Sequence, residues 1–212
     1  MIEGLIFDFD HTISENSETN DSQILAILRQ FSVPGDDAAI LDIIQAATSD
    51  YAICKHFLLG EAIDKAYQMI LAVNLDQVGK ARYSDAVIHV LIQLNLRYPL
   101  FVLSGRDELS LKHSLQQKKI GHLFKEIVGD NLMALPKPHP DNLVSMANRN
   151  ALDLNNCIYI GDSLTDHQLA LSAGCHFIGA GWYHQQLTNI QPCCDDVRNL
   201  SDLIDKVPET IS

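Results

Sequence analysis

The feature that most constrains the fold is a regular alternation, after about residue 83, of short apolar runs with helical patterns. Apolar runs of strand length occupy residues 98–104, 126–129, 157–162 and 176–180. Helical patterns occupy residues 84–96, 107–118, 140–150, 164–173 and, near the end of the chain, 199–206. Apolar strands that alternate with helices are typical of a parallel sheet covered by helices on both faces. The sequence therefore predicts an α/β fold with a three-layer, parallel-sheet core.

A first strand, over residues 2–10, precedes a region of different character. The polar stretch "SENSETNDS" follows it at 14–22, and residues 21–75 carry apolar side chains at helical spacing without a convincing strand. This pattern predicts an all-helical insertion after the first strand. We expect a core domain formed by residues 1–14 and 83–212, and a helical cap domain formed by residues 15–82.

Composition excludes several classes of function. The 212 residues carry a formal net charge of −12, whereas nucleic acids and anionic membranes attract positively charged surfaces. No apolar run is long enough to span a bilayer, and the N-terminus lacks the pattern of a secretory signal. The five cysteines form no CxxC pair, which favours reduced thiols and a cytoplasmic protein. We expect no nucleic-acid or membrane partner, and the sequence leaves the oligomeric state open.

Polar side chains gather where the predicted strands end. They are Asp8, Asp10 and Thr12 after the first strand, Ser104, Gly105 and Arg106 after the second, Lys137 before the helix at 140–150, and Asp162, Ser163 and Asp166 after the strand at 157–162. Ligands of parallel α/β sheets bind at the carboxyl ends of the strands. We therefore expect these groups to share one site.

The residue types at these positions suit phosphoryl-transfer chemistry. Clustered carboxylates bind Mg²⁺, which neutralises their charge and is often completed by a substrate phosphate. Lys137 can offset the charge of a phosphoryl group, and Ser104 can donate a hydrogen bond to it. One aspartate can then act as a nucleophile, and the aspartate two residues further on can act as the acid–base.

Four motifs resemble those of a known superfamily. "DFDHT" at 8–12, "LSGR" at 103–106, "KPHPD" at 137–141 and "GDSLTD" at 161–166 are similar, in this order, to the motifs of the haloacid dehalogenase-like superfamily. Within it, the chain resembles most the phosphoglycolate-phosphatase-like group, which inserts a small helical cap after the first motif. The resemblance implies a Rossmann-like core and covers nearly the whole chain except the cap.

The resemblance also implies a role for each matching residue. Asp8 would be the nucleophile, and Asp10 would protonate the leaving alcohol and then activate water. Ser104 would orient the phosphoryl group, and Lys137 would stabilise its charge and hold Asp8.

The same resemblance implies the ligands of Mg²⁺ and of the phosphate. Asp162 would bind the cation together with the Asp8 carboxylate and the Asp10 backbone carbonyl, and Asp166 would lie close to the metal or to Lys137. The backbone amides of Phe9, Asp10 and Gly105 would face the phosphate.

One residue departs from the family pattern. His11 stands where the family usually has glycine, and histidine adopts a positive φ less readily than glycine does. Either the loop keeps its shape at some strain, or His11 points at the substrate. The aspartate at position 10 disfavours dehalogenation, since the dehalogenases of the family generally lack it.

Together these observations predict a Mg²⁺-dependent phosphomonoester hydrolase that acts on a small phosphorylated metabolite through an aspartyl-phosphate. Two alternatives stay open at the level of sequence. One is a phosphosugar mutase of the same family, and the other is a phosphate- or Mg²⁺-binding regulatory protein without turnover. The physiological substrate and the residues that select it are not apparent from the sequence.

Overall fold

The computed structural model describes residues 1–15, 20–47, 49–77, 81–130, 135–183, 187 and 190–207. Four residues of the predicted polar stretch at 14–22, residues 16–19, lie outside this part of the chain. Among the described residues, no helix is long and apolar enough to cross a membrane.

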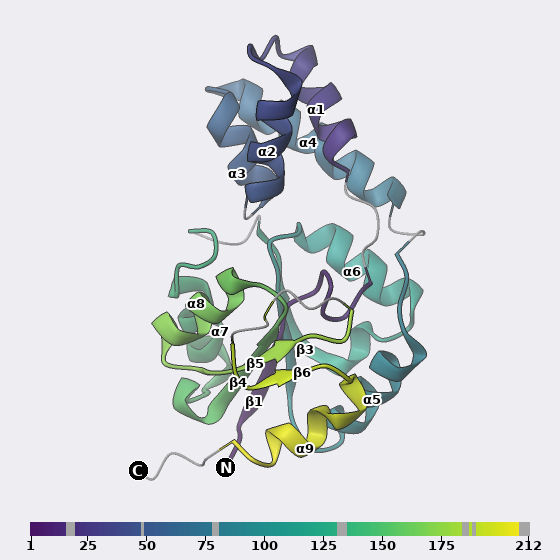
Figure 1. The fold of residues 1–212 in the computed structure, drawn as a ribbon, viewed down its shortest axis with the longest axis vertical. Coiled ribbons are helices and arrows are strands. Elements are labelled where there is room, and N and C mark those ends of the chain that lie inside the picture. Colours follow the sequence, from purple (N-terminus) through teal and green to yellow (C-terminus); the bar gives the residue numbers. More distant parts are fainter. Residues whose placement is uncertain are drawn as a thin grey trace.

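A six-stranded parallel sheet forms the centre of the larger part of the molecule (Figure 1). Its strand order is β3-β2-β1-β4-β5-β6. The strands are β1 (Gly4–Phe7), β2 (Leu100–Leu103), β3 (Phe124–Val128), β4 (Cys157–Gly161), β5 (His176–Ala180) and β6 (Cys193–Cys194). This arrangement confirms the predicted α/β class. The two-residue strand β6 was not predicted, since so short a run carries no periodicity.

Helices cover both faces of this sheet, because each strand alternates its side chains between two apolar layers. Leu5 and Phe7 of β1 pack on one face, and Ile6 packs on the other. The first face is covered by α5 (Asp85–Asn95), α6 (Glu108–Gln117) and α9 (Leu200–Ile204). The second face is covered by α7 (Asp141–Asn150) and α8 (Leu164–Ala173). Short 3-10 helices span Gly121–Leu123, Leu154–Asn156 and Val197–Asn199.

Capping side chains explain where several helices begin. Ser84 accepts a hydrogen bond from the Ala86 amide at the start of α5, and Asp107 accepts one from the Ser110 amide at the start of α6. Such caps satisfy amide groups that have no partner within the helix. The helices predicted to start at 84 and 107 therefore begin one residue later. The helix predicted to start at 140 also begins one residue later, but Pro140 at its start makes no side-chain capping hydrogen bond.

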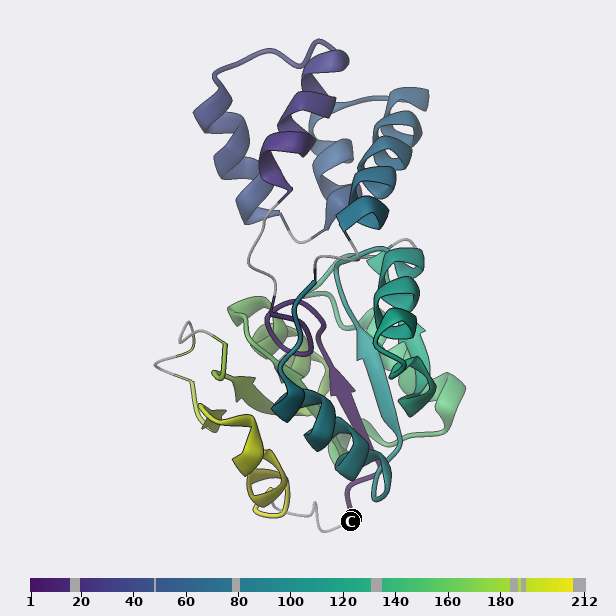
Figure 2. The ribbon, with the colours of Figure 1, turned by 90° about the vertical axis from the view of Figure 1, so that its right-hand side faces the viewer.

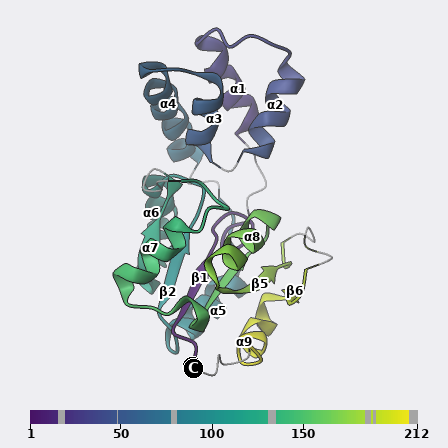
Figure 3. The ribbon, with the colours of Figure 1, turned by 90° about the vertical axis from the view of Figure 1, so that its left-hand side faces the viewer.

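Four further helices, which we call the helical segment, build a second apolar core. They are α1 (Asp21–Gln30), α2 (Asp37–Ala46), α3 (Asp50–Phe57) and α4 (Glu61–Gln77). Their buried side chains, among them Leu28, Ile53 and Ile70, form a cluster separate from the two sheet layers. Figures 2 and 3 show the helical segment beyond the carboxyl end of β1, above the sheet. The exact division into a core domain and a cap domain stays a prediction.

The strand order places a crevice above the middle of the sheet. From β1 the chain moves outward through β2 and β3 on one side, and from β4 it moves outward through β5 and β6 on the other. Ligands in open α/β sheets bind at such a switch point, outside the carboxyl ends of the strands. The loops that follow β1 and β4 lie at this position and carry most of the predicted site residues.

Candidate active site

The loop after β1 carries Asp8 and Asp10. The Asp8 amide donates a hydrogen bond to the Ile160 carbonyl of β4 at 2.8 Å, which fixes the start of the loop to the sheet. The chain then turns tightly, and the Phe9 carbonyl accepts hydrogen bonds from three following amides, those of Thr12, Ile13 and Ser14. The turn holds Asp8 and Asp10 above the sheet edge.

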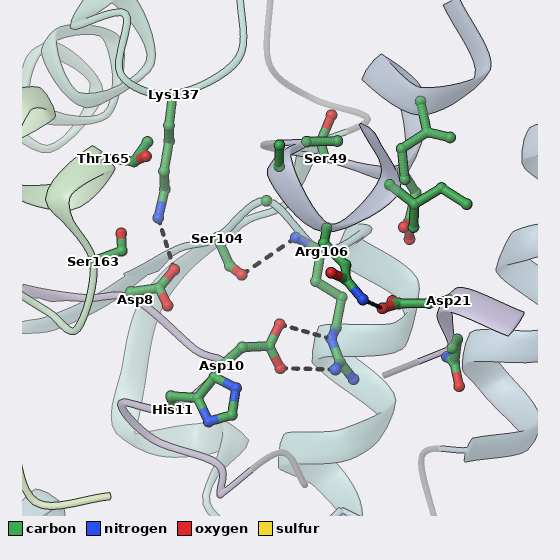
Figure 4. A pocket seen from close by; sticks show the side chains of 18 of the residues that line it. Asp8, Asp10, His11, Asp21, Ser49, Ser104, Arg106, Lys137, Ser163 and Thr165 are labelled. Atoms are coloured by element: carbon green, nitrogen blue, oxygen red, sulfur yellow. Dashed lines mark hydrogen bonds and ion pairs between the residues drawn. The ribbon is translucent and has the colours of Figure 1, made fainter. Parts of the chain in front are cut away.

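His11 occupies the turn with a φ of 56°, so the loop keeps the backbone conformation that favours glycine. For a residue with a side chain this left-handed conformation costs about 1 kcal/mol or more. The His11 side chain also lines the cavity described below, close to Asp10 (Figure 4). Partial burial lowers its pKa. The sequence left two possibilities for His11, a strained loop or a side chain that points at the substrate. The structure shows the strained backbone, and it also places the side chain at the cavity.

Lys137 is the centre of the site. Its side chain is only 6% exposed, and its Nζ lies 2.7 Å from Asp8 Oδ1, 2.9 Å from Asp166 Oδ1 and 2.6 Å from the Tyr159 hydroxyl. Two anionic partners hold the ammonium in its charged form and raise the pKa of Lys137 in spite of burial. The Tyr159 hydroxyl in turn donates to the Leu103 carbonyl at 2.8 Å. Lys137 thus contacts Asp8 from the loop after β1, Tyr159 from β4 and Asp166 from α8, and Tyr159 extends this network to the end of β2.

The start of α8 fixes Asp166. Ser163 caps the helix, and the Ser163 hydroxyl donates to Asp166 Oδ2 at 2.6 Å while the Asp166 amide donates back to Ser163 Oγ at 3.1 Å. This reciprocal capping box leaves Asp166 Oδ1 directed at Lys137. Gly161 permits the close approach, because a Cβ at position 161 would lie 2.6 Å from the Asp166 carboxyl carbon.

Asp8, Asp162 and Asp166 form a buried acidic cluster. One carboxylate oxygen from each lies within 4.8 Å of the others. Burial raises the pKa of Asp8 and of Asp162, and the neighbouring carboxylates raise both further, although Lys137 opposes the shift. Three carboxyl groups therefore face one ammonium. This excess of negative charge, built from oxygen ligands, fits a divalent cation such as Mg²⁺.

Asp10 points in another direction, toward Arg106. Arg106 Nη2 lies 2.7 Å from Asp10 Oδ1, and Arg106 Nε lies 3.3 Å from Asp10 Oδ2. Figure 4 draws both contacts as dashed lines. The guanidinium also lies over the Phe9 ring at 5.3 Å from its centre. The Arg106 amide donates to Ser104 Oγ at 3.3 Å, so the loop after β2 places Ser104 beside this pair.

These groups line one cavity of about 460 Å³ between the sheet and the helical segment. Its lower wall contains eight of the nine predicted site residues, Asp8, Asp10, His11, Ser104, Gly105, Lys137, Asp162 and Asp166. Phe9 differs, because its ring is fully buried in the core and packs edge-to-face on Tyr83. Only the Phe9 backbone is therefore a candidate for contact with a phosphate, and that contact stays a prediction.

Sequence reasoning did not identify Tyr159 or the polar residues that the helical segment contributes to the cavity. Tyr159 lies within an apolar strand run, where an aromatic residue indicates a buried core position. Asn20, Asp21, Gln45, Ser49, Asp50 and Asn74 line the upper wall. In the sequence these residues look like ordinary caps and exposed helix positions.

Comparison with known proteins identifies relatives of this chain. A family model described as "Haloacid dehalogenase-like hydrolase" matches residues 5–180. A phosphoglycolate phosphatase of Aliivibrio fischeri is 30% identical over 98 residues, which cover 45% of this chain and 43% of that relative. "Probable phosphatase IndB" of Dickeya dadantii is 25% identical over 185 residues, which cover 84% of this chain and 80% of that relative.

Solved structures share the fold. CbbY from Rhodobacter sphaeroides, solved in complex with phosphate, superposes with a TM-score of 0.76 at 16% identity, over 94% of this chain and 96% of CbbY. A HAD-superfamily hydrolase from Geobacter sulfurreducens superposes with a TM-score of 0.67 at 20% identity, over 96% of each chain. The match of the family model over most of the sequence decides the assignment: the chain belongs to the haloacid dehalogenase-like hydrolase family.

Proposed function

We propose that this protein is a Mg²⁺-dependent phosphatase that hydrolyses a small phosphorylated metabolite through an aspartyl-phosphate on Asp8. The observation that carries the proposal is the contact of Lys137 with Asp8, beside Asp162 and Asp166, in the floor of the cavity. The phosphoglycolate phosphatase among its relatives supports the same reaction class.

The acidic cluster would hold the cation. The Asp8 and Asp162 carboxylates and the Asp10 backbone carbonyl are the proposed ligands, and Asp166, which Ser163 and Lys137 hold, would lie next to them. When bound, Mg²⁺ supplies positive charge that stabilises the phosphoryl oxygens. It also favours the ionised form of Asp8, which burial disfavours.

In the first step an Asp8 carboxylate oxygen attacks the phosphorus atom. A bond forms between Asp8 and phosphorus, and the bond from phosphorus to the leaving oxygen breaks. Asp10 gives a proton to that oxygen, so the product leaves as a neutral alcohol. Lys137 and the Ser104 hydroxyl compensate the charge on the phosphoryl oxygens during the transfer.

In the second step Asp10, now a carboxylate, accepts a proton from water. The water oxygen attacks phosphorus, the bond to Asp8 breaks, and inorganic phosphate leaves. Asp8 returns as a carboxylate and Asp10 as an acid, so the cycle closes without a net change in the protein.

The helical segment would act as a cap domain in this reaction. It forms the upper wall of the cavity and contributes polar groups opposite Lys137. Such a cap can exclude water and contact the leaving group while the core residues carry out the chemistry. We place the activity in the cytoplasm, since the five cysteines are free thiols.

Phosphate release tests the proposal. The protein is incubated with a panel of phosphorylated metabolites and with p-nitrophenyl phosphate, with Mg²⁺ and with a chelator. We expect release that requires Mg²⁺ and that Asp8→Asn abolishes, while Asp64→Asn, an exposed substitution on α4, keeps it. Full activity of Asp8→Asn would refute the mechanism.

Two other outcomes would replace the proposal. An isomeric phosphosugar formed without free phosphate would indicate a mutase. Binding of Mg²⁺ without any product from the folded protein would indicate a regulatory protein, and His11→Gly would then be the next variant to assay.

A further inference from the structure

The two walls of the cavity differ in charge. Among the described residues that line it, the cationic side chains, Lys137 and Arg106, and the one histidine, His11, all come from the lower wall. Among the described residues that line the cavity, the helical segment contributes two carboxylates, Asp21 and Asp50, and no basic side chain. A leaving group that extends from the phosphoryl site toward the helical segment therefore meets acidic and neutral polar groups.

Asp50 is held in place by a chain of amides. Asn74 Nδ2 on α4 donates to Asp50 Oδ2 at 2.6 Å, and Asn20 Nδ2 donates to Asn74 Oδ1 at 2.8 Å. Asn74 is only 7% exposed, so this network is fixed by packing. Among the described residues, Asp50 Oδ1 has no hydrogen-bond partner, and Asp50 lines the cavity. Asp50 therefore offers an acceptor to a bound molecule.

Arg106 offsets this charge only in part, although its positive charge favours the ionised form of Asp50. Its guanidinium forms two hydrogen bonds with Asp10, and in the Proposed function Asp10 is needed at that position as the acid–base. A leaving-group carboxylate would have to displace Asp10 from Arg106 or lie against the acidic upper wall. Both arrangements disfavour an acid such as glycolate, because like charges brought together out of water repel strongly.

The volume of the cavity also bears on the size of the leaving group. At about 460 Å³ it lies within the range of about 300–1,000 Å³ that is typical of sites for small molecules. It therefore leaves room for a leaving group larger than the two-carbon glycolate. Besides the polar groups, the helical segment lines it with the apolar side chains of Ile24, Ile44 and Ile53.

We propose that Asp50 selects the leaving group, and that the substrate is a phosphate ester of an alcohol that carries hydrogen-bond donors and no carboxylate. A hydroxyl of a polyol or sugar would donate to Asp50, and an ammonium group would satisfy the same acceptor. This inference rests on the phosphatase activity proposed above, and it turns the specificity away from phosphoglycolate.

Matched pairs of esters test the inference and separate the two kinds of donor. Glycerol 3-phosphate and 3-phosphoglycerate differ in a hydroxymethyl group against a carboxylate, and phosphoethanolamine and phosphoglycolate differ in an aminomethyl group against a carboxylate. We expect kcat/KM to be about tenfold or more higher for the donor-bearing member of at least one pair. The pair with the larger ratio identifies hydroxyl or ammonium as the preferred donor.

Equal or faster hydrolysis of the carboxylate-bearing member in both pairs would overturn the inference and leave the phosphatase activity standing. Failure to release phosphate from all four esters and from p-nitrophenyl phosphate would instead overturn the Proposed function, and this inference with it.

Substitution of Asp50 assigns the selectivity to this residue. In Asp50→Asn, which has nearly the same shape, we expect the ratio within the preferred pair to fall about tenfold, mainly through faster hydrolysis of the carboxylate ester. Asp42→Asn, at an exposed position of α2, is the matched control and should keep the wild-type ratio. Asp21→Asn, which removes the second carboxylate of the upper wall, should lower the ratio less. An unchanged ratio in a folded Asp50→Asn variant would refute the role of Asp50.

Discussion

Arg106 and Asp10 form a two-point contact in the wall of the cavity, with Nη2 at 2.7 Å from Oδ1 and Nε at 3.3 Å from Oδ2. The fork geometry of a guanidinium matches a carboxylate, so the pair fixes the orientation of the carboxylate as well as its charge. The Phe9 ring supports the guanidinium from one side. Arg106 is therefore a positioning residue for the proposed acid–base.

The first prediction concerns this pair. Arg106→Ala should lower kcat by about tenfold to a hundredfold, because a general acid–base out of position loses part of the factor of about 10²–10⁴ that such catalysis provides. Arg106→Lys keeps the positive charge but cannot form two parallel hydrogen bonds with the carboxylate. Its kcat should therefore lie between those of Arg106→Ala and the wild type. Steady-state kinetics with p-nitrophenyl phosphate measure both. Arg97→Ala, which removes an exposed arginine paired with Asp205, is the control. A kcat for Arg106→Ala equal to that of the control would contradict the positioning role.

A second prediction concerns Tyr159, whose hydroxyl lies between Lys137 and the Leu103 carbonyl. Tyr159→Phe removes an acceptor of the buried ammonium and the donor to a buried carbonyl. Leaving such groups unsatisfied costs about 1–3 kcal/mol, so the free energy of unfolding should fall by about that amount. Urea denaturation followed by circular dichroism measures the change. Tyr98→Phe, which removes an exposed hydroxyl beside Arg97 and Asp205, should change stability much less. Equal stability of the two variants would show that the Tyr159 hydroxyl contributes nothing.

The sequence was sufficient to predict that residues which follow a strand lie close together, although their roles stay predictions. Asp8, Ser104 and Asp162 come directly after apolar runs, and the carboxyl ends of parallel strands must meet at one edge of the sheet. Local pattern plus topology was sufficient to bring these residues to one cavity. The same reasoning explains why the α/β class could be predicted.

Residues whose position depends on packing across the fold could not be predicted. Tyr159 belongs to the site because β4 directs its side chain toward Lys137. An apolar strand pattern does not predict which group the hydroxyl of a buried tyrosine will contact. Asp50 faces the cavity only because the helical segment lies over the sheet. The partner of Arg106 likewise depends on how two loops, separated by about a hundred positions in sequence, approach each other.

A third prediction concerns the pH dependence of Mg²⁺ binding. The pKa values of Asp8 and Asp162 are raised, so in slightly acidic solution the cation must displace protons that these carboxyl groups hold. Mg²⁺ affinity should therefore increase as the pH rises from 6 to 8, and binding should release protons. Isothermal titration calorimetry in buffers of different ionisation enthalpy measures both quantities. The Asp162→Asn variant should bind Mg²⁺ weakly at every pH. An affinity that stays constant over this range in the wild type would contradict the predicted proton displacement.

A fourth prediction follows from the burial of Asp50. The pKa of Asp50 is raised from 3.8 to about 7. Burial is the largest cause, and Asp130 and Asp107 also raise the pKa, whereas the hydrogen bond from Asn74 and the charge of Arg106 lower it. The folded protein therefore binds this proton more tightly than the unfolded chain does. The stability that the proton provides is complete below about pH 3.8 and is lost as the pH rises through about 7.

Asp50→Asn cannot lose this stability, since an amide does not ionise. Relative to the wild type, the variant should become more stable as the pH rises from 4 to 8, and the gain should level off above about 7. Thermal unfolding of both proteins across this range measures the difference in Tm, in which the titration of all other groups largely cancels. Asp42→Asn should show a difference that hardly depends on pH, because Asp42 is exposed. A difference for Asp50→Asn that is flat with pH would mean that the Asp50 carboxyl group ionises as freely in the folded cavity as in the unfolded chain.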